Sequence, residues 1–250
     1  SVVIRWEGRE SADAVVTVTE QAPGAPAVAT PLGALPSTSE SSFHSRRIDD
    51  LAPATRYRYA VTANGVTSDE GHFTTPSHSD ERFTFQVYGD NRTDHAAHAA
   101  VVSQMRKRQA AFAIHTGDMV FSGGKPEEWG QFFAIEGPLL RDRCVFACIG
   151  NHELFDGGGA AFLRYFHPGM HGDPSLTYTV RWGSARFFFL NAFSTTLTTA
   201  DRVWLERELN DADSEVGVQH RFIVMHQGPS SSGPHGGGAF FDESLRQLLL

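Results

Sequence analysis

Positive charge is scarce in this chain of 250 residues, which carries 21 Lys and Arg against 29 Asp and Glu for a formal net charge of −8. Proteins that bind nucleic acid through its phosphates concentrate basic residues, so we expect no nucleic-acid partner. Long apolar stretches are also missing, and none approaches the roughly 18 residues that cross a bilayer. The sequence therefore predicts no membrane span.

Cysteine is nearly absent, and two common enzyme motifs are missing. Cys144 and Cys148 are the only cysteines, and in an extended strand they would lie about 13 Å apart, which is too far for a disulfide. No G-x-G-x-x-G follows an apolar run, and no G-x-S-x-G occurs. Dinucleotide binding and a serine nucleophile of the α/β-hydrolase kind therefore lack support.

The residues that are present form two regions, which join near Pro76. Residues 1–75 show period-2 alternation in short bursts, and Asn64-Gly65 stands between two of them. Asn-Gly is the pair that a two-residue hairpin prefers, because both positions need a positive φ. Tyr57 lies in a strand that we expect to begin with a tyrosine-corner-like turn. Residues 1–76 are thus predicted to form a small all-β sandwich.

After residue 82 the pattern changes to apolar bursts separated by helix-like segments, as in an α/β fold. The predicted strands cover residues 83–88, 110–115, 144–149, 186–193 and 221–226. The predicted helices cover residues 95–109, 127–140, 160–166, 200–211 and 241–250. A capping box between Thr198 and Asp201 opens the fourth of these helices. Residues 82–250 therefore form a second predicted domain.

Four of the apolar bursts are followed by side chains that bind metals. In chain order these are Asp90, Asp118, Asn151 and His226, separated by 28, 33 and 75 residues. The carboxyl ends of strands in an open α/β sheet converge on one crevice. Carboxylate, amide and imidazole ligands without thiolate suit Zn, Mn or Fe and argue against a structural zinc site. A single Gly-Asp pair is most simply a turn, but the ordered set predicts a metal centre.

This ordered set resembles the calcineurin-like metallophosphoesterase family. With the β-rich region before it, the chain resembles the purple acid phosphatase-type branch. The resemblance implies a fibronectin type III-like sandwich over residues 1–76, followed by an α/β metallophosphoesterase sandwich over residues 82–250. We expect the first domain to lack its first strand and the second to lack its last strands. The chain alone is therefore expected to be weakly active or inactive.

The resemblance also implies a role for each ligand. Asp118 would bridge two divalent or trivalent metal ions, Asp90 would bind the first ion, and Asn151 and His226 would bind the second. A hydroxide shared by the two ions would attack phosphorus directly, so that no protein nucleophile is needed.

Two neighbours of Asn151 complete the expected site. His152 would face the substrate, where it would stabilise the phosphoryl oxygens and could protonate the leaving group. Glu153 would orient its neighbours without binding metal.

Arg92 and Phe121 depart from the family pattern. Many members carry His or Gly two residues after the first aspartate, where this chain has Arg92, and purple members carry tyrosine where it has Phe121. We interpret Arg92 either as a two-pronged phosphate clamp or as part of a surface ion pair with Asp94 or another neighbour. Without the tyrosine no purple colour is expected, and the first metal could be Fe, Zn or Mn.

Three further histidines have two possible interpretations each. The family's closing Gly-His-x-His motif does not occur after His226, and His235 is not part of such a motif. His235 instead lies in a Gly/Ser-rich stretch that either approaches the substrate or forms a plain surface loop. His95 and His98 begin the first predicted helix, where they either face the crevice and touch substrate or are solvated.

The leading hypothesis is an enzyme that hydrolyses small-molecule phosphoesters with two metal ions, and monoesters are favoured. A phosphodiesterase of the same superfamily would use the same metals, and a catalytically degenerate binding module is the third possibility. Because enzymes with this domain pairing are commonly exported, the resemblance implies a secreted or periplasmic protein.

Overall fold

The structure, a computed structural model, describes residues 1–8, 14–21, 27–30, 43–77, 81–166, 176–191 and 198–228. These residues belong to two compact units, Ser1–His78 with Leu140–Cys144 and Ser79–Leu139 with Val145–Leu250. His235 and the helix predicted over residues 241–250 lie outside the described residues.

The first unit is built from β-strands. Their bounds are β1 (Val2–Glu7), β2 (Ala14–Glu20), β3 (Ala27–Thr30), β4 (Phe43–Ile48), β5 (Arg56–Ala63), β6 (Val66–Thr67) and β7 (Gly71–Thr74). Strands β1 and β4 pair antiparallel, and the other strands form a sheet of order β3-β2-β5-β6 in which β7 also pairs with β5. Apolar side chains that alternate along β2 and β5 supply most of the core, with Val16 fully buried.

Both local predictions for this unit are confirmed. Asn64 and Gly65 have φ of 50° and 75°. They connect β5 to β6 as a two-residue turn, since Ala63 at the end of β5 pairs with Val66 at the start of β6. The Tyr57 hydroxyl oxygen accepts the N–H of Ala52 at 2.9 Å, which is the hydrogen bond of a tyrosine corner.

The second unit alternates strands and helices. Apart from Leu140–Cys144, where α2 ends and β10 begins, this unit holds β8 (Phe85–Tyr88), α1 (His95–Arg106), β9 (Phe112–His115), α2 (Pro126–Asp142), β10 (Cys144–Ala147), the 3-10 turn η1 (His152–Gly157), α3 (Gly159–Phe166), β11 (Tyr178–Trp182), β12 (Ala185–Phe189), α4 (Thr199–Ser214) and β13 (His220–Val224). Every strand and helix predicted within the described residues is present, with ends that differ by a few residues. Strand β11 and turn η1 were not predicted.

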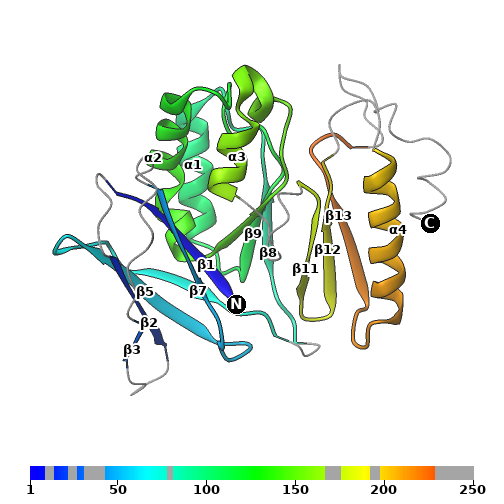
Figure 1. The fold of residues 1–250 in the computed structure, drawn as a ribbon, viewed down its shortest axis with the longest axis horizontal. Coiled ribbons are helices and arrows are strands. Elements are labelled where there is room, and N and C mark those ends of the chain that lie inside the picture. The colour runs from blue at the N-terminus through cyan, green and yellow to red at the C-terminus, as the bar shows by residue number, and fades with distance from the viewer. Residues whose placement is uncertain are drawn as a thin grey trace. The chain divides into compact units, whose positions relative to one another are not determined.

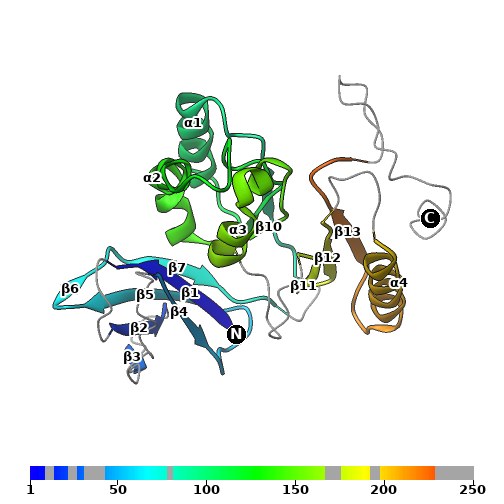
Figure 2. The ribbon, with the colours of Figure 1, turned by 45° about the horizontal axis from the view of Figure 1, so that its top comes forward.

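Two three-stranded sheets stack in this unit, with the orders β10-β9-β8 and β11-β12-β13. The ring centroids of Phe85 and Phe187 are 5.1 Å apart, and those of Phe112 and Phe187 are 5.3 Å apart, so aromatic side chains fill the space between the sheets. Helices α1 to α3 lie on one side of the β8-β9 sheet, and β11 to β13 lie on the other (Figure 1). Helix α4 covers the outer face of β12 and β13 (Figure 2), where Leu205 packs against Phe188.

Helix α4 begins as its sequence predicts. The Thr198 side chain accepts the N–H of Asp201, and the Asp201 side chain accepts the N–H of Thr198, which completes the capping box. Among the described residues, no helix has both the length and the apolar character that a bilayer crossing requires.

Candidate functional site

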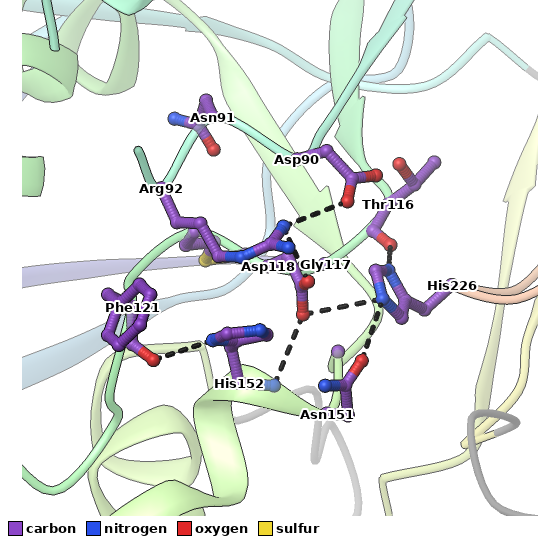
Figure 3. Close-up of polar contacts among 12 residues, drawn as sticks. Asp90, Asn91, Arg92, Thr116, Gly117, Asp118, Phe121, Asn151, His152 and His226 are labelled. Atoms are coloured by element: carbon purple, nitrogen blue, oxygen red, sulfur yellow. Dashed lines mark hydrogen bonds and ion pairs between the residues drawn. The ribbon is translucent and has the colours of Figure 1, made fainter. Parts of the chain in front are cut away.

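Each predicted metal ligand lies just beyond the end of a strand. Asp90 follows β8, Asp118 follows β9, Asn151 follows β10 and His226 follows β13. Figure 3 shows these side chains gathered in one place. One ligand atom from each of Asp90, Asp118 and His226 lies within 4.8 Å of the others. Ligands far apart in the sequence are therefore brought together.

Close approach of the backbone shapes two of these loops. A Cβ on Gly150 would lie 2.2 Å from Asp118 Oδ1, and a Cβ on Gly117, whose φ is +94°, would lie 2.7 Å from Gly150 N. Asp90 and Asp118 themselves have φ of 55° and 57°. Such left-handed backbone costs a non-glycine residue about 1 kcal/mol or more and is typical of functional sites.

His226 presents a single ring nitrogen to the other ligands. Its Nδ1–H donates to the Thr116 carbonyl at 2.9 Å. Its Nε2 lies 3.3 Å from Asp118 Oδ1 and 3.2 Å from Asn151 Oδ1. A backbone hydrogen bond at one nitrogen orients the other for a metal. Carboxylate, amide oxygen and imidazole nitrogen therefore face one another in a donor set that fits Zn, Mn or Fe.

Asp118 and His226 shift the pKa of one another. Burial would raise the pKa of Asp118, but the hydrogen bond and charge of His226, the backbone N–H of His152 and the charge of Arg92 together hold it below its usual value. Burial would lower the pKa of His226, but its hydrogen bond to Asp118 raises it. Asp118 is thus held as a carboxylate, the form that binds metal.

The Arg92 guanidinium contacts both of the carboxylates that are predicted to bind metal. Its Nη1 is 2.7 Å from Asp118 Oδ2 and 3.0 Å from Asp90 Oδ1, as Figure 3 shows. An ion pair with Asp94 was one interpretation of the sequence, but the Asp94 carboxylate instead caps helix α1 by accepting the N–H of Ala97 at 2.9 Å. The Arg92 side chain is 23% exposed.

His152 lies beside the ligands and between two aromatic rings. Its backbone N–H donates to Asp118 Oδ1 at 3.2 Å, and its Nδ1–H donates to the Phe121 carbonyl at 2.6 Å. The ring centroid of His152 is 5.2 Å from that of Phe121 and 4.6 Å from that of Phe155. These contacts fix the imidazole and leave its Nε2 as the nitrogen that can act on a substrate.

The buried carboxylate of Glu153 accepts hydrogen bonds from the loop that holds Asp118 and from the loop that holds Gly150 and Asn151. It accepts the backbone N–H of Asp118 at 2.8 Å, of Met119 at 2.7 Å and of Gly150 at 2.7 Å. Burial raises the pKa of Glu153 above its usual value, although these three N–H groups favour the ionised form. The orienting role expected of Glu153 thus has a geometric basis.

A buried hydrogen-bond network behind the site was not predicted from the sequence. His115 Nδ1 accepts the N–H of Gly117 at 3.1 Å, so its Nε2–H donates to Asn91 Oδ1 at 2.9 Å. Asn91 Nδ2 is 2.6 Å from His98 Nε2, which is also 2.7 Å from Glu136 Oε1. The network links the loops after β8 and β9 to helices α1 and α2. Burial, with the nearby His98, lowers the pKa of His115 to about 3.

His95 and His98 take different positions. The prediction that His98 faces the crevice or the solvent is wrong, because its side chain is only 2% exposed and pairs with Glu136. It shares a helix face with Val102 and Met105, and a histidine at that spacing was the available signal for a buried role. His95 is exposed at the start of α1, so its substrate contact stays a prediction.

Stacked sheets between helices, with carboxylate, amide and imidazole side chains gathered at the strand ends, are the architecture of a metallophosphoesterase-like fold. Residues 83–249 match the family of the Calcineurin-like phosphoesterase, and the chain belongs to this family.

Two proteins from strains of Mycobacterium tuberculosis, named uncharacterized protein MT2654 and uncharacterized protein Rv2577, are each 23% identical to this chain over 253 residues. The match covers 86% of this chain and 47% of each relative. The chain thus spans about half the length of the curated relatives that it matches.

Solved structures show the same fold. The purple acid phosphatase PPD1 from yellow lupin (Lupinus luteus) seeds superposes with a TM-score of 0.78 and 17% identity, covering 98% of this chain and 53% of that chain. PhoD superposes with a TM-score of 0.62 and 14% identity, covering 86% of this chain and 56% of that chain.

Proposed function

We propose that this chain carries the catalytic core of a metal-dependent hydrolase of small-molecule phosphoesters, with monoesters favoured. The observation that carries the proposal is the convergence of Asp90, Asp118, Asn151 and His226 from four strand ends. Membership of the Calcineurin-like phosphoesterase family supports a phosphoester as the bond that is broken.

The ligands divide between two proposed metal positions. Asp118 would contribute to both, Asp90 would complete one, and Asn151 and His226 would complete the other. Bound ions of Fe, Zn or Mn supply a water molecule of lowered pKa and offset charge on the phosphoryl oxygens. No side chain of the site is proposed as the nucleophile, so the phosphoryl group would be transferred directly to water.

His152 is the proposed catalytic residue that touches the substrate. Its Nδ1–H is engaged by the Phe121 carbonyl, so Nε2 is the nitrogen that would hold a phosphoryl oxygen or protonate the leaving oxygen. Arg92 is proposed as a second group that binds phosphoryl oxygens, since a guanidinium offers several donors in one plane.

We also propose that the first unit is a fibronectin type III-like sandwich, which the Tyr57 corner supports. The sequence resemblance to exported enzymes further supports a secreted or periplasmic location.

The test is hydrolysis of p-nitrophenyl phosphate and of bis(p-nitrophenyl) phosphate by the full-length protein that contains this chain. With Zn²⁺, Mn²⁺ or Fe supplied, we expect faster cleavage of the monoester and a loss of about 1,000-fold in Asp118→Asn, since metal ions contribute several kcal/mol to such reactions. Asp211→Asn, at an exposed position of α4, is the matched control. Faster cleavage of the diester would indicate a phosphodiesterase. No cleavage of either substrate would favour a degenerate binding module.

A further inference from the structure

Asp118 divides its two carboxylate oxygens between different partners. Oδ1 faces His226 Nε2 at 3.3 Å and accepts the N–H of His152 at 3.2 Å. Oδ2 faces Arg92 Nη1 at 2.7 Å, and the same nitrogen is 3.0 Å from Asp90 Oδ1. The guanidinium therefore holds the two carboxylate oxygens that the proposed Asp90 metal position would need.

A positive charge is most needed by the buried member of this pair. The Asp118 side chain is 2% exposed, whereas that of Asp90 is 63% exposed, and a buried carboxylate is costly unless a positive charge or hydrogen bonds compensate it. Arg92 supplies that charge from within the chain, two residues after Asp90 on the loop that leads into α1.

The guanidinium is not bound in its best geometry. A single nitrogen, Nη1, contacts both carboxylates, whereas arginine binds carboxylates most strongly through two parallel N–H groups. Its Nε is buried and has no hydrogen-bond partner, which costs free energy. The arrangement neutralises the carboxylates but leaves the guanidinium replaceable by a cation of higher charge.

We propose that Arg92 is an internal counter-ion that competes with one metal ion for Asp90 and Asp118 Oδ2. This inference rests on the proposed function, and it concerns the order in which the metals bind. The position formed by Asp118 Oδ1, Asn151 and His226 is free of the guanidinium and fills first. The Asp90 position fills only when the guanidinium leaves the carboxylates.

This competition reconciles the observed ion pairs with the clamp role proposed for Arg92. While Nη1 is held by Asp90 and Asp118, it is not available to a phosphoryl oxygen. Once a metal ion takes those oxygens, the guanidinium is released at the edge of the same site. Full metal loading therefore prepares Arg92 to bind substrate.

The first experiment is a titration of the metal-free full-length protein with Zn²⁺, in which calorimetry measures the affinity of each binding step. The unmodified protein should bind two Zn²⁺ in steps of unequal affinity. Arg92→Gln should tighten the weaker step about tenfold or more, because one charge-assisted contact accounts for at least that factor, and should leave the tighter step unchanged. Arg207→Gln is the matched control, because Arg207 is 64% exposed and lies on α4, away from the loops that carry Asp90 and Asp118. The proposal is overturned if the affinity of the weaker step in Arg92→Gln stays within about twofold of that in the unmodified protein. It is also overturned if both proteins bind Zn²⁺ in a single step.

The second experiment does not depend on the folding of Arg92→Gln. The side-chain Nε–H signal of Arg92 is followed by NMR in the unmodified protein during the same titration, after assignment by its loss in Arg92→Lys. The signal should move with the second equivalent of Zn²⁺, and movement with the first equivalent or no movement overturns the proposal. Either result is separable from failure of the proposed function, which would appear as normal two-step Zn²⁺ binding without phosphoester hydrolysis.

Discussion

The carboxylate of Glu153 accepts the backbone N–H of Asp118 at 2.8 Å. Through this bond and the bond from Gly150, one buried side chain sets the relative position of the loops that carry Asp118 and Asn151. The positions of the predicted ligands thus depend on a side chain whose oxygens already accept backbone N–H groups.

Replacement of Glu153 by alanine should reduce the free energy of unfolding by about 3 kcal/mol or more, because it leaves the buried N–H groups of Asp118, Met119, Val120 and Gly150 without their carboxylate acceptor. Urea unfolding of the metal-free protein measures this change. Glu206→Ala, at an exposed position of α4, should have almost no effect. A change for Glu153→Ala as small as that of the control would mean that the loops are held by other contacts.

Removal of His226 should weaken the tighter Zn²⁺ step by about 100-fold or more, since even loss of a residue that only orients a metal ligand costs 10- to 100-fold. His226→Ala is compared by calorimetry with His220→Ala, whose side chain is exposed on β13. Equal affinities in the two variants would exclude His226 as a ligand.

His152→Ala should lower kcat by about 100-fold or more for phosphate esters with poor leaving groups and far less for p-nitrophenyl phosphate, because only poor leaving groups need a proton from the imidazole. Steady-state kinetics over a series of aryl phosphates provide the measurement, and the Zn²⁺ content should not change. A loss that is the same across the whole series would assign His152 to phosphoryl binding alone.

His115 should make the folded protein sensitive to acid. Its pKa is lowered to about 3 in the folded state, whereas an unfolded histidine titrates near pH 6.5. Between these values only the unfolded chain takes up the proton, so this contribution to stability is complete above about pH 6.5 and is lost as the pH falls toward 3. The slope is at most about 1.4 kcal/mol per pH unit.

Urea unfolding of His115→Gln between pH 7 and pH 4 measures this contribution. The variant should be less stable at pH 7, because Gln cannot replace both ring hydrogen bonds, but its stability should fall less steeply with acid. His220→Gln should keep the slope of the unmodified protein. An unchanged slope in His115→Gln would mean that His115 is not kept neutral.

The grouping of the predicted metal ligands could be foreseen because each one follows an apolar strand. Asp90, Asp118 and Asn151 follow strands of one sheet, whose carboxyl ends converge, whereas His226 follows β13 of the second sheet and joins them because the two sheets stack. The hairpin at Asn64-Gly65 and the Thr198 cap were predictable for a similar reason, since each depends only on residues close in sequence.

The contacts of Arg92 and His98 were not predictable in the same way. A guanidinium on a long side chain can reach several carboxylates, and the choice of Asp90 and Asp118 over Asp94 depends on the path of the loop. The pairing of His98 with Glu136 requires α1 and α2 to pack on the same face of the sheet, which no local pattern specifies. Strand β11 (Tyr178–Trp182) alternates apolar and polar residues, but its run of five residues is too short to separate it by pattern from the residues around it.

The central claim, that these strand ends bind metal, is tested most directly by anomalous diffraction from crystals of the full-length protein soaked in Zn²⁺. Data collected on both sides of the zinc absorption edge should show a peak about 2.0–2.2 Å from His226 Nε2 and from an Asp118 oxygen, with Asn151 Oδ1 beside it. The absence of any peak between Asp118, Asn151 and His226 at saturating Zn²⁺ would contradict the account.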